Sequence, residues 1–136
     1  MDSAYRLVLE PTGIDDYLRL RKESGLSART REEAENGING AWACAIVVHV
    51  ESGEIVGMGR VISDGGWYFH IIDMAVLPGH QRKGIGDAVL TALLERIDAH
   101  APNAYVNLLA DPPGRRLYAR HGFVESAPAS IGMKRA

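Results

Sequence analysis

Residues 70–87 have the sequence HIIDMAVLPGHQRKGIGD, and this stretch decides the fold. Its first half has an apolar centre and ends at Pro78, which is typical of a strand that is buried on both faces. Its second half contains two glycines, Gly84 and Gly86, and a helical pattern of apolar residues begins at Ile85. The stretch therefore predicts a buried strand that leads through a glycine turn into a helix.

Apolar periodicity and turn residues divide the rest of the chain into further strands and helices. The expected strands cover 5–10, 41–50, 55–62, 67–77, 104–110, a segment that begins at Phe123, and 130–134. The expected helices cover 14–25, 30–37, 85–100 and 113–122. Thr30 and Glu33 form a predicted capping box at the start of the second helix. The resulting order, β-α-α-β-β-β-α-β-α-β-β, predicts a single mixed sheet with helices packed on it.

Length, composition and charge limit the class of protein. At 136 residues and 46% hydrophobic, the chain fits a single domain over residues 1–136. A net charge of −2 gives no general attraction to nucleic acid. No apolar run approaches the roughly 20 residues that span a bilayer, and the N-terminus has no apolar leader. With Cys44 as its one cysteine the chain has no disulfide framework. We expect a cytoplasmic protein with no nucleic-acid or membrane partner.

The glycine turn has the features of a phosphate site. The first turn of a helix has unpaired N–H groups and a partial positive charge, and Arg82 and Lys83 directly precede Gly84. A Walker A loop is excluded because no Gly-Lys-Ser/Thr follows at the required spacing. A dinucleotide fingerprint is excluded because its third glycine would fall at Val89. An ordinary glycine cap of a helix is the remaining alternative.

Gln81-Arg82-Lys83-Gly84-Ile85-Gly86 resembles the Gln/Arg-x-x-Gly-x-Gly/Ala signature of the GNAT superfamily of acyl-CoA-dependent N-acyltransferases. The strand end at 74–78 and the segment 117–123, LYARHGF, are similar to two further motifs of that family. The resemblance extends over nearly the whole chain. It implies a GNAT-like fold of the α/β (α+β) class, with a single mixed, mostly antiparallel sheet flanked by helices. It also implies an N-acetyltransferase that uses acetyl-CoA and a small primary amine.

The resemblance further implies which residues contact CoA. In the family, strand backbone pairs with the pantetheine arm and loop amides hold the pyrophosphate. The corresponding residues are Met74, Ala75, Val76, Gln81, Arg82, Lys83, Gly84, Ile85, Gly86 and Asp87. Two positions depart from the family: Asp111 replaces an asparagine that bonds to the arm, and Gly114 replaces an alanine. Asn107 is a candidate substitute donor, and a cross-strand or surface asparagine is the alternative.

Acetyl transfer to an amine requires a base, a donor to the oxyanion and an acid for the leaving thiolate. The resemblance assigns the acid to Tyr118, whose phenol is protonated at neutral pH, and the oxyanion donor to the backbone near Val76. Several family members have a glutamate where this strand has Ile72. His70 shares that face of a straight strand, and a neutral imidazole can accept the proton. Asp73 would reach the site only if the strand bulges, and ordered water is a further alternative.

Other chemistries lack their motifs. No His-Glu-x-x-His or paired-cysteine spacing predicts a metal, and no Gly-x-Ser-x-Gly elbow predicts a serine nucleophile. Two other functions stay open: a noncatalytic CoA-binding or sensing module, and an acetyltransferase that acts on a protein amine. The resemblance places the acceptor site around the basic segment 21–31, which does not identify the acceptor. The sequence also leaves the oligomeric state open, a homodimer included.

Overall fold

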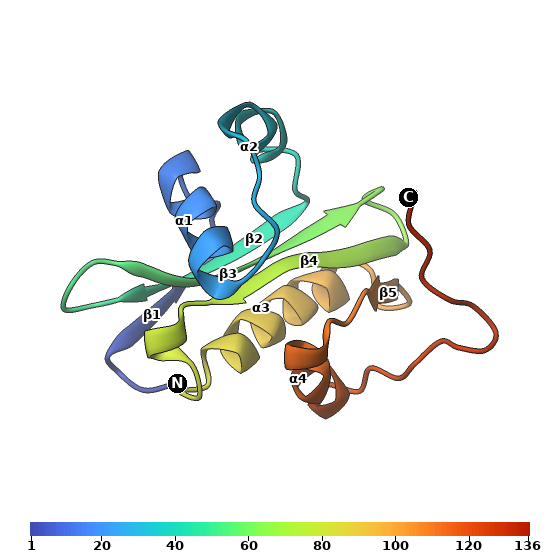
Figure 1. The fold of residues 1–136 in the computed structure, drawn as a ribbon. Helices are drawn as coiled ribbons and strands as arrows, with labels where there is room; N and C mark the ends of the chain where they lie inside the picture. The colour runs from blue at the N-terminus through green and yellow to red at the C-terminus, as the bar shows by residue number, and fades with distance from the viewer.

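The computed structural model describes the chain from Met1 to Ala136. Its strands are β1 (Tyr5–Val8), β2 (Ala43–His49), β3 (Ile55–Ser63), β4 (Tyr68–Val76) and β5 (Tyr105–Leu108). Its α-helices are α1 (Ile14–Ser24), α2 (Arg31–Gly37), α3 (Ile85–His100) and α4 (Arg115–Arg120). None of these helices is both long and apolar enough to cross a membrane. The strands form one five-stranded sheet with helices on both sides (Figure 1), so the predicted fold class is confirmed.

The sheet has the order β1-β2-β3-β4-β5 and contains one parallel pair. β1 to β4 are antiparallel neighbours, whereas β4 and β5 run parallel and are joined by α3. This crossover helix is what a parallel connection requires. The pairing of β4 with β5 begins at Tyr68 and ends at Ile71. From Ile72 to Val76, β4 therefore has no partner on the β5 side, and the sheet is split there.

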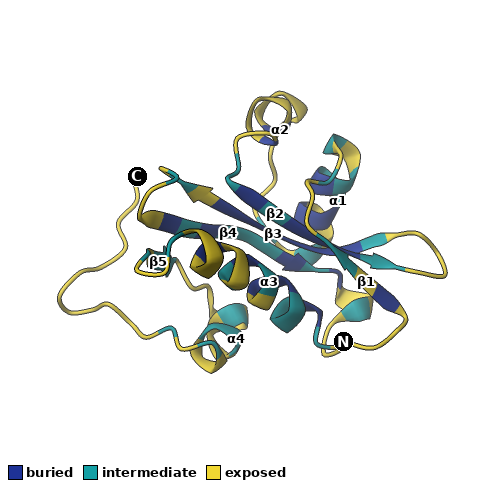
Figure 2. Cartoon of the chain, turned by 180° about the vertical axis from the view of Figure 1, so that it is seen from behind, coloured by how far each residue is buried: buried dark blue, intermediate teal, exposed yellow.

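Different helices cover the two faces of the sheet. α3 packs on β2, β3 and β4, whereas α1 contacts β3 and β4 from the opposite face (Figures 1 and 2). Gly59 of β3 lets α3 approach closely, because a Cβ there would lie 2.7 Å from the side chain of Val89. α4 lies on the α3 side, where Leu117 contacts the first turn of α3 at Gly86. The glycine loop and α4 are thus on one face, and α1 and α2 on the other.

Strand β4 has a β-bulge at Asp73, whose φ is 56°. On β3, Arg60 pairs with Ile72 and Met58 pairs with Ala75. Gly59 between them therefore lies opposite two residues of β4, Asp73 and Met74. A bulge of this kind re-aims a side chain, and the carboxylate of Asp73 consequently points to α1. Asp73 was predicted to reach the site only if the strand bulges, and the bulge is present.

The strands expected from Phe123 and over 130–134 are not formed, and this part of the prediction is wrong. No helix or strand follows α4 (Figure 1). A strand needs partners for its backbone groups, and the outer edge of β5 has none. Pro128 lacks an N–H, and Val124 and Met133 are 89% and 85% exposed, so neither backbone pairing nor burial holds this segment in a sheet.

Candidate active site

The loop between β4 and α3 presents a row of free backbone donors. None of the backbone N–H groups from Arg82 to Asp87 donates a hydrogen bond within the chain, and the first bond of the helix runs from Ala88 to the carbonyl of Gly84. Every helix leaves about four such groups unpaired, and here the row extends into the loop. Arg82 and Gly84 have φ values of 62° and 79°, and turns of this kind gather N–H groups into an anion-binding concavity. The loop can therefore hold a phosphate group.

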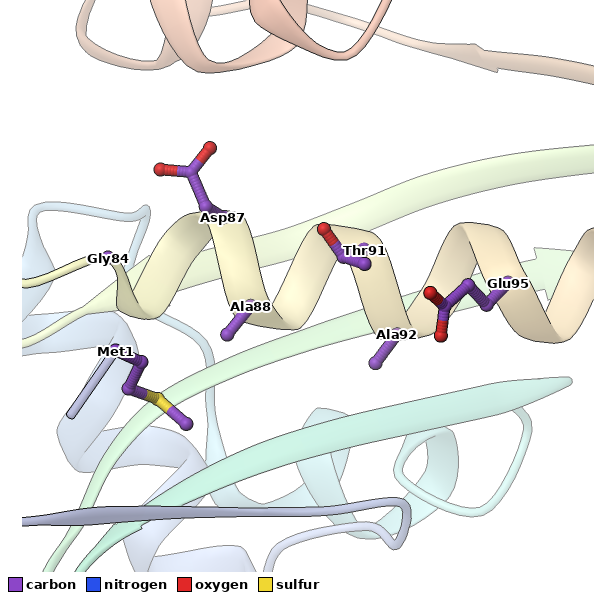
Figure 3. Close-up of a pocket in the computed structure, with 7 residues that line it drawn as sticks. All are labelled: Met1, Gly84, Asp87, Ala88, Thr91, Ala92 and Glu95. Carbon is purple, nitrogen blue, oxygen red and sulfur yellow. The ribbon is translucent and has the colours of Figure 1, made fainter. Parts of the chain in front are cut away.

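Gly84 and Gly86 have different structural roles. Gly84 lies at the start of α3 (Figure 3) and needs its left-handed φ of 79°. An open groove of about 540 Å³ begins beside it and follows α3 to Glu95 (Figure 3). A Cβ on Gly86 would instead lie 3.2 Å from Leu117 of α4. A larger residue at 86 would displace α4, whereas a substitution at 84 acts on the loop backbone itself.

Gly84→Val is expected to weaken acetyl-CoA binding about tenfold. A left-handed conformation costs an L-residue roughly 1–2 kcal/mol, more when it is β-branched, and relaxing that strain turns the loop amides away from the phosphates. Calorimetry on the folded variant measures the affinity. Gly79→Ala is the matched control, because a Cβ at Gly79 has no atom within 4 Å and its φ is not positive. Unchanged affinity in Gly84→Val would contradict the site.

Asp87 joins the first turn of α3 to α4. Its carboxylate accepts hydrogen bonds from Arg120 at 3.0 Å and from His121 at 2.9 Å. In Figure 3 its side chain points away from the side of the helix that carries Ala88 and Ala92. Burial alone would raise the pKa of Asp87, yet the bonds from His121 and Arg120 hold it below its ordinary value. The carboxylate thus stays charged, and its basic partners offset that charge beside the phosphate loop.

Tyr118 lies on α4 with an unpaired hydroxyl. Its ring packs edge-on against Phe123, with the ring centroids 6.1 Å apart. A Cβ on Gly114 would lie 2.8 Å from the ring, so the departure from the family alanine makes room for this tyrosine. Burial, and to a lesser extent the charge of Asp111, raises the pKa of the Tyr118 phenol. The phenol therefore holds its proton at neutral pH and can donate it.

Asp73 is held by three donors that sequence reasoning did not connect with it. Its carboxylate accepts hydrogen bonds from Tyr17 at 2.6 Å, from Arg60 at 3.0 Å and from Arg21 at 2.5 Å. The side chains of Arg21 and Arg60 are only 8% and 10% exposed, so the cluster is buried. A signal was present in the sequence. Arg60 and Asp73 are the only charged residues in their apolar β-runs, and isolated opposite charges in adjacent strands indicate a buried pair.

The cluster fixes Asp73 in its ionised form and ties the helices to the sheet. Burial alone would raise the pKa of Asp73, but the hydrogen bonds from Tyr17 and Arg60 and the charge of Arg21 lower it below its ordinary value. A carboxylate with so low a pKa is a poor acceptor of a proton at neutral pH. Two further bonds run from Arg21 to the carbonyl of Ser27 and from Arg60 to the carbonyl of Gly37.

His70 is bonded to β5. Its Nδ1 lies 2.8 Å from Oδ1 of Asn107, which is directly opposite in the parallel register. The amide nitrogen of Asn107 donates in turn to the hydroxyl of Tyr68 at 2.9 Å. The side chain of Asn107 is thus engaged at both ends, and its predicted contact with CoA would require these bonds to break. Tyr68, which the sequence did not predict as a site residue, is thus connected to His70 through Asn107.

The predicted site residues lie on both faces of the sheet, around the split between β4 and β5. The glycine loop and Tyr118 are on the α3 face, whereas Asp73 points to α1. Phe69 is buried on the α3 side, so its neighbour His70 faces the α1 side. The predicted partners of the CoA arm, from Met74 to Val76, lie on β4 along the split. Gln81 donates its side-chain amide to the carbonyl of Val76 at 3.1 Å. Side chains on both faces of the sheet could therefore reach an acyl donor that is bound in the split.

Side chains suited to other chemistries are less favourably placed. Cys44 is half-buried, and burial raises the pKa of its thiol, which disfavours the nucleophilic thiolate. No three His, Cys, Asp or Glu side chains lie close enough together to hold a metal ion. The expectation of a reaction without a metal remains a prediction.

A split α/β sheet with a row of free backbone donors at a helix N-terminus is an arrangement that can bind a phosphorylated cosubstrate. The family model of the acetyltransferase (GNAT) domain matches residues 22–132. The chain therefore belongs to the GNAT acetyltransferase family, whose members use acetyl-CoA, and the resemblance in the sequence is confirmed. No curated protein matches the chain.

Solved structures agree with this assignment. A probable acetyltransferase from meticillin-resistant Staphylococcus aureus is 34% identical, with a TM-score of 0.90 over 97% of this chain and 98% of that one. Glucosamine-6-phosphate N-acetyltransferase from Arabidopsis thaliana is 19% identical, with a TM-score of 0.68 over 96% and 98%. The ribosomal-protein-S18-alanine N-acetyltransferase from Escherichia coli is 14% identical, with a TM-score of 0.73 over 90% and 80%. The last two share the fold alone.

Proposed function

We propose that this chain transfers the acetyl group of acetyl-CoA to the primary amine of a small molecule. The observation that carries the proposal is the row of free backbone N–H groups from Arg82 to Asp87, on the same face as the unpaired phenol of Tyr118. The first feature can bind a pyrophosphate and the second can protonate a thiolate. Membership of the GNAT family supports acetyl-CoA as the donor.

The reaction requires two proton transfers. The amine nitrogen attacks the acetyl carbonyl carbon, the new C–N bond forms, and the C–S bond breaks. Tyr118 gives its proton to the departing sulfur, and the base takes one proton from the amine nitrogen. Solvent then returns a proton to the phenolate. The backbone N–H near Val76 is proposed to stabilise the oxyanion between these steps.

His70 is the proposed base, and Asp73 is assigned a positioning role. The carboxylate of Asp73 accepts hydrogen bonds from two guanidinium groups and a phenol. These bonds stabilise its ionised form, so it is a poor acceptor of a proton. His70 uses only Nδ1 in its bond to Asn107. Its Nε2 forms no hydrogen bond within the chain, and a neutral imidazole can accept a proton there.

We propose a small acceptor because the segments on the α1 face form a wall that is fixed to the sheet. Arg21 holds the loop after α1 through Ser27, and Arg60 holds the end of α2 through Gly37. Both guanidinium groups are anchored at the same carboxylate. A wall tied down in this way favours a defined small acceptor over an extended polypeptide, which would need a wide groove.

A panel of small primary amines and N-terminal peptides tests the proposal, with release of CoA thiol as the readout. Turnover above background hydrolysis with small amines is the expected result. Turnover with peptides alone would replace the acceptor by a protein amine. Acetyl-CoA binding by calorimetry without turnover on any amine would favour the noncatalytic sensor.

His70→Ala is expected to lower kcat by about 10²-fold, because the variant lacks the proposed acceptor of the amine proton. KM for acetyl-CoA should change little, since the loop amides proposed to bind the phosphates are untouched. Steady-state kinetics measure both constants, and a kcat within about threefold of the unmodified protein would point to water as the acceptor of the proton.

A further inference from the structure

We infer that Asn107, anchored by Tyr68, is a positioning residue that selects the tautomer of His70; this inference rests on the proposed role of His70 as the base. The three side chains form a chain of hydrogen bonds across the parallel pair β4 and β5, with distances of 2.8 Å from His70 to Asn107 and 2.9 Å from Asn107 to Tyr68. Asn107 was predicted as a substitute donor to CoA, in place of the family asparagine that Asp111 replaces. The observed bonds assign it a different task.

The orientation of the Asn107 amide in the structure sets the direction of the bonds. The amide nitrogen of Asn107 donates to the hydroxyl oxygen of Tyr68, so its carbonyl oxygen is the atom that faces His70. A carbonyl oxygen can only accept, and Nδ1 of His70 must therefore carry the proton. In a neutral imidazole the other nitrogen then has a free lone pair. The bond thus leaves Nε2 as the basic atom.

The strand geometry keeps this arrangement in place. His70 and Asn107 are directly opposite in the register of β4 and β5, where side chains on the same face lie next to each other. Tyr68 is two residues before His70 and so lies on the same face. Its ring is supported by Tyr105 of β5, with the ring centroids 5.5 Å apart. The anchor of Asn107 is therefore held by packing as well as by its hydrogen bond.

The imidazole of His70 forms no hydrogen bond or ion pair with a charged group. On β3, the residue opposite His70 is Ile62, and on β5 it is Asn107. On the α1 face of the sheet, the carboxylate of Asp73 is paired with Arg60 of β3 and with Arg21 of α1. The phenol of Tyr68 is connected to His70 through the amide of Asn107. The tautomer of His70 is thus controlled by the amide of Asn107.

The tautomer can be measured independently of turnover by ¹⁵N NMR of the imidazole nitrogens in the full chain, with the signals assigned from His70→Gln. The unmodified protein at neutral pH should show His70 protonated at Nδ1. In Asn107→Leu, which keeps the approximate size but offers no acceptor, the proton should move to Nε2. Tyr68→Phe should give a mixture of the two, and Tyr105→Phe, which keeps the ring and touches no bond to Asn107, should match the unmodified protein.

Kinetics provide the second readout. Asn107→Leu should lower kcat by about tenfold with little change in KM for acetyl-CoA, since the proton on Nε2 blocks the base. Asn107→Asp still offers an acceptor to Nδ1, so it should keep the tautomer and retain most of kcat. A purely structural role for Asn107 would not distinguish Asn107→Asp from Asn107→Leu in this way.

The outcomes separate this inference from the proposed function. A proton on Nε2 in the unmodified protein, or an unchanged tautomer in Asn107→Leu, overturns the positioning role whatever the activity. If the tautomers are as expected but His70→Ala turns over at the full rate, the hydrogen-bond assignment stands and the role of His70 as base is overturned. If both readouts follow the expected pattern, both are supported.

Discussion

Tyr118→Phe is expected to lower kcat by about 10²- to 10⁴-fold, which is the usual contribution of a general acid. The variant keeps the ring that packs over Gly114 and against Phe123, and removes only the hydroxyl. KM for acetyl-CoA should change little, because the loop amides that bind the phosphates are untouched. Steady-state kinetics with the best amine of the panel measure both constants.

The stability of Tyr118→Phe is its control. The hydroxyl of Tyr118 makes no hydrogen bond within the chain, so its removal should leave the free energy of unfolding unchanged or slightly higher. A loss of rate accompanied by unfolding would say nothing about the acid. A folded variant whose kcat stays within about threefold of the original would remove Tyr118 from the mechanism.

Asp73→Asn is expected to destabilise the fold by about 3–5 kcal/mol. The amide has nearly the same size as the carboxylate but leaves Arg21 and Arg60 without an anionic partner in a buried cluster. Chemical denaturation with a constant m-value measures the difference. Asp15→Asn is the matched control, because Asp15 is 87% exposed and pairs with Arg31 at the surface. The control should change the stability by no more than about 1 kcal/mol.

The pH dependence of stability gives a second test of the Asp73 cluster. The pKa of Asp73 is lowered from its ordinary value of 3.8, so its contribution is fully present above that value. It is lost as the pH falls further, through the lower pKa of the folded state. The unmodified protein should therefore lose stability in acid, and Asp73→Asn should lose less over the same range. Equal acid sensitivity of the two would show that the ion pairs do not stabilise the fold.

Local sequence patterns determined most of the fold. The capping box of Thr30 and Glu33 was predicted from two residues and is present at the start of α2. Helix α3 has the predicted bounds, since its apolar stripe and its glycine start are both local signals. The prediction failed after Phe123, where extended sequence was taken for strands. Whether an extended segment becomes a strand depends on a partner elsewhere in the chain, which local periodicity does not supply.

The sequence by itself determined the family and the position of the glycine loop, because glycines and basic residues at the start of a helix suffice to indicate free backbone donors. Only the tertiary structure decided what each side chain does. Asp73 was a candidate proton acceptor in the sequence, and long-range contacts with Arg21 and Arg60 hold it as the anion of a buried ion-paired cluster. Asn107 was a candidate CoA donor, and the register of β4 and β5 places it on His70. A carboxylate or an amide acquires its role from the donors and acceptors around it, and the fold brings those together from distant parts of the chain.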